Sequence, residues 1–335
     1  MTAVIYSQEA TPGLVTVVIP AYRADDCLGE ALAAIAGQTY SNWEVIVVED
    51  ASQGTTQAIV QDFSKEHPQH RVAYFRNDKN RGPSHTRNVA FQEARGEFIA
   101  LLDADDRWFQ THLAANVQVL REQQVDLAYS SVVMIEDGTD FLLGLWGPQQ
   151  DDVDDFPHGL FKRNFITPSA TVLRRSVIAD VGLWATNLRL CEDLDYWLRC
   201  LAQGKKFGYV GGCHVLYCQN RPEAATRNRC ALQEAFAGVV ERYPNLPGTR
   251  QRTCRNLASK AWASAAVGHY RGDRQKDPSA NPAKTPALLM KAWKLRPKRV
   301  DHLLRATLLR LVGLLGQNRS TPAAAASTPV LKAAS

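Results

Sequence analysis

The sequence lacks several features that would place it in a common class of protein. It has no run of about 18 or more apolar residues, so we expect no membrane-spanning helix. Residues 1–11 lack a basic start followed by an apolar stretch, and we therefore expect no signal peptide there. No Gly-x-Gly-x-x-Gly follows the first predicted strand, which excludes a dinucleotide-dependent dehydrogenase.

The seven cysteines are odd in number and include no Cys-x-x-Cys pair. This pattern is typical of reduced thiols in the cytoplasm rather than of a disulfide framework or a zinc site. Cys213-His214 lies near Cys218, but the spacing matches no common set of zinc ligands. We therefore expect a cytoplasmic protein without structural disulfides.

The net charge of +5 is unevenly distributed along the 335 residues. Residues 1–240 contain 21 Lys and Arg against 30 Asp and Glu, a net charge of −9. Residues 241–335 contain 18 against 4, a net charge of +14. A basic C-terminal part on an acidic body indicates an anionic partner for that part.

The first hundred residues alternate between short apolar runs and amphipathic segments. Leu14–Ile19 is a β-branched run closed by Pro20, which is typical of a strand buried on both faces. The same pattern predicts further strands at 43–48, 72–75 and 97–102, separated by helices at 28–35, 55–66 and 84–94. Such alternation predicts an α/β fold with a doubly wound, mostly parallel sheet.

Beyond Trp108 the pattern is less regular. It predicts helices at 111–124, 176–181 and 193–203, strands at 127–135 and 170–173, and a long loop at 136–157. From residue 231 the sequence predicts a helical region, interrupted by a polar stretch near 272–286. The small and polar residues at the C-terminal end are expected to be disordered.

Three aspartates directly follow a predicted buried strand. The apolar run Phe98–Leu102 leads into Asp103, Asp105 and Asp106. Like charges at one strand end repel and raise one another's pKa values, and a divalent cation removes that repulsion. Oxygen ligands suit Mg²⁺ or Mn²⁺, and ligands of open α/β sheets bind beyond the carboxyl ends of the strands. We interpret these aspartates as part of a metal–diphosphate site, and a solvated acidic turn is the alternative.

Polar residues also follow the first two predicted strands. Asp50 ends the second strand, where an ionised carboxylate accepts a hydrogen bond from the N–H of a uracil-like base or else forms a local turn or cap. Pro20-Ala21-Tyr22-Arg23 follows the first strand. Tyr22 stacks on the base or packs internally, and Arg23 is positioned to pair with phosphate.

Two further segments carry charged residues at the starts of helices. Asn80-Arg81-Gly82 precedes a helix whose N-terminal amides suit a phosphate or a carboxylate. One turn later, Arg87 pairs with Asp103, pairs with a ligand, or holds the acidic cluster together. Glu192-Asp193 precedes an aromatic-rich helix and is either a helix cap or a source of a general base. Asp195 is expected to face away and stabilise its helix.

Taken together, these ordered motifs resemble glycosyltransferase family 2, whose members are inverting nucleotide-sugar enzymes with the A-type fold. The resemblance spans roughly residues 15–217. It is carried by Val17-Val18-Ile19-Pro20-Ala21-Tyr22, Val47-Val48-Glu49-Asp50-Ala51-Ser52, Asn80-Arg81-Gly82 with Arg87-Asn88, Gly96-Glu97-Phe98-Ile99, Leu102-Asp103-Ala104-Asp105-Asp106 and Glu192-Asp193.

The resemblance implies a role for each matching position. It assigns the catalytic base to Asp193, supported by Glu192, and metal binding to Asp105, Asp103 and Asp106, with Mn²⁺ or Mg²⁺ as cofactor. It places on the acceptor side Thr167, Pro168, Ser169 and Trp197. It assigns to the nucleotide-sugar site Pro20, Tyr22, Arg23, Asp50, Arg81, Gly82, Arg87, Asp103 and Ala104.

The resemblance also implies the reaction and its partners. Asp193 deprotonates an acceptor hydroxyl, which displaces the diphosphate of a nucleotide-sugar donor in line and inverts the anomeric centre. UDP is the favoured nucleotide, and the acceptor is a glycan or a lipid-linked glycan. The implied domains are a catalytic A-type domain at 12–225, a basic helical region at 226–318 and a disordered tail at 319–335.

The sequence departs from the family pattern at three places. Glu49 and Ala51 stand where the family usually has Asp and Gly. The segment 217–221 has no histidine in register for a third metal ligand, and His214 is expected on a strand instead. Ser84-His85-Thr86 replaces the commoner turn before Arg87.

The basic C-terminal segment has two interpretations. Its apolar residues with basic residues on the other side are typical of a helix on an anionic membrane, while the same pattern suits a helix docked on the catalytic domain. We expect no nucleic-acid binding, because no aromatic interleaving supports it. The residues concerned are Lys291, Lys294, Arg296, Lys298, Arg299, Arg305 and Arg310 with Leu288, Leu289, Trp293, Leu303, Leu304, Leu308, Leu309, Leu311, Leu314 and Leu315.

Two other functions stay open at this point. A nucleotidyltransferase on a similar sheet commonly needs a Gly-rich phosphate loop with a lysine, which the segment after the first strand does not supply. A non-catalytic nucleotide-binding homologue is the second alternative. Intact Asp50, Asp103, Asp105 and Asp193 favour the enzyme.

Overall fold

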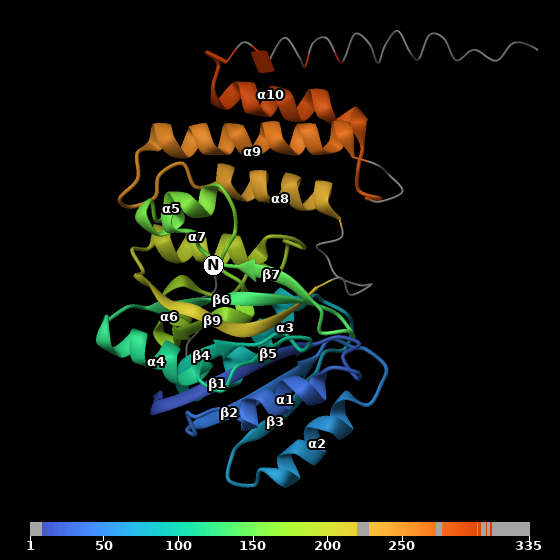
Figure 1. Ribbon diagram of the computed structural model, residues 1–335, viewed down its shortest axis with the longest axis vertical. Helices are drawn as coiled ribbons and strands as arrows, with labels where there is room; N and C mark the ends of the chain where they lie inside the picture. Colours follow the sequence, from blue (N-terminus) through green and yellow to red (C-terminus); the bar gives the residue numbers. More distant parts are fainter. Residues whose placement is uncertain are drawn as a thin grey trace, which may run out of the picture.

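A mixed β-sheet crosses the middle of the protein, with helices on both faces (Figure 1). The computed structural model describes residues 9–219, 228–272 and 277–299, together with residues 301, 302, 306 and 309. The strands run in the order β3-β2-β1-β4-β8-β6-β9-β5, and β7 pairs with β6 beside this path. The α/β fold class predicted from the sequence is confirmed.

The first half of the sheet is parallel and built from strand–helix–strand units, as predicted. β1 pairs in parallel with β2 and β4, and β2 pairs in parallel with β3. Parallel pairing brings the carboxyl ends of these strands to one edge. The elements are β1 (Thr11–Ala21), α1 (Leu28–Ala36), β2 (Trp43–Glu49), α2 (Thr56–Glu66), β3 (Val72–Arg76), α3 (Pro83–Glu93) and β4 (Gly96–Leu101).

The second half of the sheet is mixed rather than mostly parallel. β8 lies antiparallel between β4 and β6, while β6 and β9 are parallel to each other. Its strands are β5 (Arg107–Trp108), β6 (Leu127–Glu136), β7 (Leu142–Trp146), β8 (Thr171–Arg174) and β9 (Phe207–Gln219). Its helices are α4 (His112–Glu122), α5 (Gln150–Asp154), α6 (Arg175–Val181) and α7 (Glu192–Ala202), with short 3₁₀ turns η1 (His158–Phe161) and η2 (Pro168–Ala170).

The predicted loop at 136–157 is wrong in part, because it contains β7 and α5. The turn residues around Gly138 dominate the local composition and conceal the apolar run that follows. That run pairs with β6 as a hairpin, and its side chains are unusually exposed: Phe141 by 64% and Leu145 by 68%. His214 lies on β9, as expected.

Alternate residues of the central strands pack into two separate apolar layers. Val17 and Val47 point toward the layer that contains α1, α2 and α4. Val18 and Ile46 point toward the opposite layer, which contains α3, α6 and α7. Because successive side chains point to opposite faces and both faces are covered by helices, apolar residues occupy consecutive positions in these strands.

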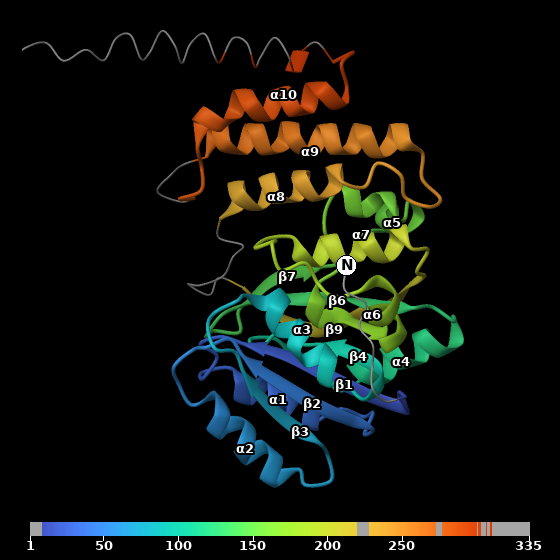
Figure 2. The same cartoon turned by 180° about the vertical axis from the view of Figure 1, so that it is seen from behind.

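Three C-terminal helices stack above α7 in successive layers (Figures 1 and 2). They are α8 (Arg229–Glu241), α9 (Gln251–Arg271) and α10 (Thr285–Leu295). Val239, Val240 and Ala258 belong to the same apolar cluster as Trp197 of α7. The helical region therefore shares a core with the sheet. The predicted domain boundary at 225/226 lies outside the described residues, as does the predicted tail 319–335.

The described part of the basic segment docks on the protein. Leu288, Leu289 and Ala292 of α10 are buried in a cluster with Trp262 of α9, and the Lys291 ammonium lies 3.9 Å from the centre of the Trp262 ring. None of the helices among the described residues is both long and apolar enough to span a bilayer. The other residues of the predicted membrane helix lie outside the described part: Leu303, Leu304, Arg305, Leu308, Arg310, Leu311, Leu314 and Leu315.

Asp195 links α7 to the C-terminal helices. It faces away from the site, as expected. Its Oδ2 accepts a 3.1 Å hydrogen bond from Arg199 Nε, and its Oδ1 accepts a 2.9 Å bond from the Tyr243 hydroxyl just after α8. Because Asp195 is only 4% exposed, its removal leaves two polar partners poorly solvated.

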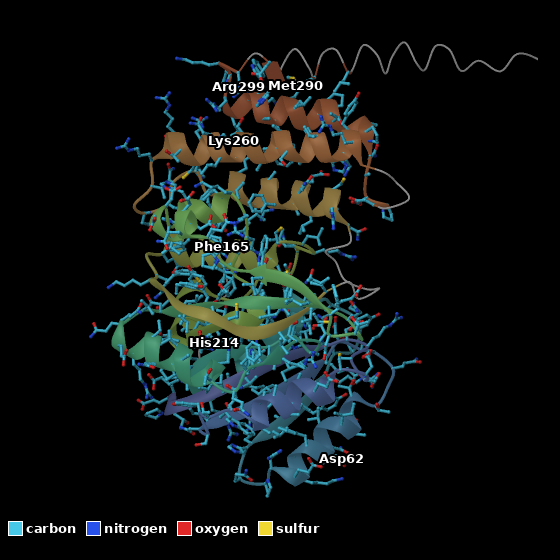
Figure 3. All side chains as sticks on the ribbon, viewed as in Figure 1. Asp62, Phe165, His214, Lys260, Met290 and Arg299 are labelled. Carbon is cyan, nitrogen blue, oxygen red and sulfur yellow. The ribbon has the colours of Figure 1, made fainter. Side chains whose placement is uncertain are left out.

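Replacing Asp195 by Ala is expected to lower the free energy of unfolding by about 3 kcal/mol, because the buried Arg199 loses its counter-charge. Urea denaturation followed by circular dichroism measures the change. Asp62→Ala is the control, since its pair with Lys65 on α2 is solvent-exposed and contributes little (Figure 3). Equal midpoints for the two variants would contradict the proposed linkage.

Candidate active site

The carboxyl ends of β1, β2 and β4 open onto one cavity of about 470 Å³. Segments far apart in the sequence meet there, including the start of α7. Most of the predicted site residues line this cavity: Pro20, Tyr22, Arg23, Asp50, Gly82, Arg87, Asp103, Ala104, Asp105, Glu192 and Asp193. The spatial convergence that the sequence predicted is therefore present.

Asp50 organises the loop that leads into α3. Its Oδ1 accepts hydrogen bonds from Asn77 Nδ2 at 2.7 Å and from the Arg81 backbone N at 2.9 Å. Its Oδ2 accepts a 2.7 Å bond from the Gly82 backbone N. The carboxylate is thus fixed at the cavity wall with its acceptor oxygens oriented. Arg81 contributes its backbone here, because its side chain pairs with Asp78 at 3.0 Å instead.

Arg87 holds the acids at the cavity floor. Its guanidinium forms an ion pair with Asp103 and lies 3.9 Å from Glu192 Oε1. It also stacks on the ring of Trp184, with its Cζ 4.8 Å from the ring centre. Arg87 is only 3% exposed. Through its two partners it links the segment after β4 to the first residue of α7. Of the three predicted roles, pairing with Asp103 and holding the cluster together are both observed.

Asp106 was predicted to bind metal with Asp103 and Asp105, but its position does not fit that role. It is 1% exposed and does not line the cavity. Both of its oxygens already accept hydrogen bonds, one from the Ser169 hydroxyl and one from the Cys218 backbone N at 2.8 Å. Burial first, and then the charges of Asp105 and Asp103, raise the pKa of Asp106 well above its usual range. Asp106 therefore fastens η2 and β9 to the acidic turn.

The remaining pair, Asp103 and Asp105, suits a divalent cation that also has a phosphate ligand. No group of three or more His, Cys, Asp or Glu residues within the described ranges is arranged to hold a metal by itself. Mg²⁺ and Mn²⁺ commonly bind through one or two carboxylates plus substrate phosphates, so this donor set fits such a group. The surrounding potential is strongly negative: burial, followed by Asp106, Asp103, Asp193 and Asp105, raises the pKa of Tyr217.

Three non-glycine residues at this cavity adopt left-handed backbone conformations. The φ angles are 51° at Arg23, 56° at Ala51 and 57° at Cys191. Each residue lies at a junction next to a site residue: after β1, after Asp50 and before Glu192. Strained backbone of this kind persists where the surrounding structure over-determines it, often at functional sites. At Ala51 it also explains why a glycine is usual in the family that the sequence resembles.

Asp193 stands at the start of α7 with both carboxylate oxygens hydrogen-bonded. Oδ2 accepts a 2.7 Å bond from Asn164 Nδ2, and Oδ1 accepts a 2.7 Å bond from the Leu194 backbone N. Burial, and then the negative charge of Glu192, raise the pKa of Asp193 to about 7. A carboxylate with this pKa is suited to accepting a proton near neutral pH.

A second cavity of about 770 Å³ adjoins the first. The two share part of their walls, including Asp193, Tyr217 and Pro168. The second cavity extends between the η1–η2 segment, the β6–β7 hairpin and helices α8 and α9. Asp193 therefore faces both spaces from the wall between them.

Of the four residues predicted on the acceptor side, two line the second cavity and two are buried away from it. Thr167 and Pro168 line the second cavity. Ser169 is fully buried, where its hydroxyl accepts a 3.0 Å bond from the Asp103 backbone N and donates to Asp106. Trp197 is also fully buried and donates from its Nε1 to Ile166 O at 3.1 Å. A sequence motif does not fix the direction of a side chain. These two residues pack behind the residues that line the cavity and hydrogen-bond to their neighbours.

Sequence reasoning missed two residues that the structure brings to the site. Asn164 orients Asp193, and Tyr217 lines both cavities beside the acids. Asn164 lies in a segment without periodicity, so no sequence signal marks it. Tyr217 lies near the end of β9, a strand whose position follows from its pairing with β6 rather than from its own composition.

A mixed sheet with paired acids at the ends of parallel strands defines an A-type glycosyltransferase. The model of the family described as Glycosyl transferase family 2 matches residues 16–182, and the chain belongs to this family. The base predicted at Asp193 lies beyond the matched residues.

Relatives and solved structures agree with this assignment. The chain is 28% identical over 192 residues to the putative teichuronic acid biosynthesis glycosyltransferase TuaG of Bacillus subtilis, covering 57% of this chain and 73% of TuaG. It is 29% identical over 126 residues to the Escherichia coli UDP-Glc:alpha-D-GlcNAc-diphosphoundecaprenol beta-1,3-glucosyltransferase WfgD, covering 38% of this chain and 48% of WfgD.

The fold is similar to that of S. aureus TarS 1-349 in complex with UDP-GlcNAc, with a TM-score of 0.63, 17% identity and coverage of 89% of this chain and 92% of that one. It is also similar to the mannosyltransferase PcManGT from Pyrobaculum calidifontis in complex with GDP-Man and Mn²⁺, with a TM-score of 0.54, 20% identity and coverage of 89% and 86%. At these identities the likeness establishes the fold alone. The protein is a glycosyltransferase.

Replacing Ala51 by Gly is expected to stabilise the protein by about 0.5–1 kcal/mol, because glycine adopts the left-handed conformation without the Cβ clash. Thermal unfolding measures the gain as a higher midpoint. Ala33→Gly, at an exposed position inside α1, is the control and should lose about 1 kcal/mol. A loss at both positions would show that the Ala51 backbone is not strained.

Proposed function

We propose that the protein is an inverting glycosyltransferase that moves a sugar from a nucleotide diphosphate sugar to an acceptor hydroxyl. UDP is the favoured nucleotide, and the acceptor is a glycan or a lipid-linked glycan of a cell-envelope polysaccharide. One observation carries this proposal: Asp193 faces two adjoining cavities, one lined by the strand-end acids and the other open to an acceptor. The names of TuaG and WfgD agree with such a role.

In this proposal Asp193 is the general base. The acceptor hydroxyl approaches from the second cavity and donates its proton to Asp193, while Asn164 and the Leu194 backbone N keep the carboxylate oriented. Because the hydroxyl attacks from the face opposite the diphosphate, the anomeric centre inverts without an enzyme-bound sugar. Holding the two substrates on either side of one carboxylate supplies the orientation that the reaction needs.

The first cavity binds the donor. Asp50 accepts from the N–H of the base. Tyr22 is 43% exposed and offers its ring to the base, and Arg23 lies beside that ring, its Cζ 5.3 Å from the ring centre. Asp103 and Asp105 would hold a divalent cation, which would supply positive charge for the departing diphosphate. Arg87 keeps Asp103 and Glu192 in place.

A nucleotidyltransferase has less support from this site. That chemistry commonly uses a glycine-rich loop with a lysine against the phosphates. No lysine lines the donor cavity within the residues that the structure describes.

A screen of nucleotide sugars with Mn²⁺ by thermal shift identifies the donor, since ligand binding stabilises the folded state. With that donor, Asp193→Asn should reduce transfer at least about 1,000-fold, because the base is lost. Asp105→Ala should abolish the Mn²⁺-dependent thermal shift as well as transfer. Asp154→Asn, an exposed change on α5, is the control. Nucleotide release that survives both site variants would refute the proposal.

The rate of transfer should rise with pH through about 7, because only the ionised Asp193 accepts the proton. Glu192→Gln removes the neighbouring negative charge that raises the pKa of Asp193, so this acidic limb should move to lower pH. Steady-state rates between pH 5 and 9, at about saturating donor, measure the shift. An unchanged limb in the variant would argue against Asp193 as the titrating base.

A further inference from the structure

The second cavity has a wall that belongs to the C-terminal helices. On α9, Leu257, Lys260, Ala261 and Ser264 line it, which is the i, i+3, i+4, i+7 spacing of one helix face. The opposite face of α9 packs against α10 through residues such as Trp262. Phe236 of α8 lies on the same cavity wall. α9 therefore packs against both α8 and α10 and lines the cavity with one remaining face.

The wall that faces α8 and α9 across the cavity is largely apolar. It includes Met134 of β6, Trp146 of β7 and Phe161 of η1. Trp146 is the last residue of β7 and pairs with Val132 of β6, two residues before Met134 and on the same face of the hairpin. A space of about 770 Å³ with such walls favours a ligand with an apolar part.

The charges that line the cavity are mostly basic. Lys162 and Arg163 have carboxylate partners outside it, Asp155 at 2.7 Å and Asp152 at 2.5 Å. Lys260 has no carboxylate within 4 Å among the described residues, and it is exposed on α9 (Figure 3). Asp193 supplies the negative charge at the inner end. The cavity thus combines apolar walls with an ammonium group that forms no ion pair within the described part of the chain.

We propose that this cavity binds an anionic amphiphile, and that Lys260 is its anion-binding residue. Resting on the proposed function, this identifies the acceptor as a sugar attached to a lipid phosphate or diphosphate. The acceptor hydroxyl lies against Asp193, the phosphate lies against Lys260, and the hydrocarbon chain lies between Phe236 and Trp146. The C-terminal helices then determine which acceptor is used, while the strand ends bind the donor.

Dodecyl phosphate, below its micellar concentration, tests this proposal with the full-length chain and without any donor. Calorimetry should show that it binds at least about tenfold more tightly than inorganic phosphate or dodecyl maltoside, because each of these has only one of the two features. Lys260→Ala should weaken binding at least about fivefold, because the charge-assisted contact is lost. Lys294→Ala, at an exposed lysine of α10 outside the cavity, should leave binding within about twofold of the wild type.

A second variant tests the walls rather than the charge. Ala261→Trp fills the space between α9 and the hairpin and should abolish dodecyl phosphate binding, with circular dichroism reporting an intact fold. Equal binding by wild type, Lys260→Ala and Ala261→Trp would overturn the proposed site, as would equal binding of dodecyl phosphate and dodecyl maltoside by the wild type.

Donor binding separates this inference from the proposed reaction. Lys260→Ala should keep the thermal shift produced by UDP with Mn²⁺, because it lies outside the donor cavity. Transfer to a short-chain prenyl-diphosphate sugar should then show an acceptor KM raised about tenfold at an unchanged kcat. Dodecyl phosphate binding without any nucleotide binding would support the cavity and refute the transferase. Nucleotide binding with no preference for dodecyl phosphate would refute the acceptor inference alone.

Discussion

The ion pair between Arg87 and Asp103 is the constraint on which the rest of the site depends. Carboxylates from β4 and α7 are brought close together in a region with little water, where their mutual repulsion would separate the two elements. A single buried guanidinium offsets part of that charge, since it lies between Asp103 and Glu192 and rests on Trp184. The cluster keeps an excess of negative charge, as the proposed cation requires, and the ion pair holds the start of α7, where Asp193 lies.

Much of the donor half follows from the sequence because parallel strands place their carboxyl ends at one edge. Asp50 and Asp103 follow short apolar runs that alternate with predicted helices, a pattern typical of buried parallel strands. Because such strands end at the same edge of the sheet, the two residues are expected to lie close together. The acceptor half does not follow in this way. Its walls come from an antiparallel insertion at β8, a hairpin hidden by turn residues, and helices distant in sequence. The resemblance assigned Asp106, Ser169 and Trp197 to the site, yet their side chains are buried.

The C-terminal helices belong to the catalytic unit in a physical sense. They share an apolar cluster with α7, they are tied to Asp195 through Tyr243, and they complete the second cavity. The charge contrast between the two parts of the sequence is partly explained by these helices. Lys291 packs on the ring of Trp262, and Lys260 lines the second cavity. Membrane attachment through the segment beyond α10 stays a prediction.

The family match ends at residue 182, ten residues before α7 begins at Glu192. In the proposed reaction, the strand-end acids that bind the donor lie within the match, while the proposed base and the helices α8 and α9 that line the second cavity lie beyond it. Exchange of everything after the matched region between relatives would move the proposed base, its neighbour Glu192 and the α8–α9 wall of the second cavity together. If the proposed roles hold, such an exchange would change which molecule is glycosylated while keeping the ends of β1, β2 and β4 that face the donor cavity.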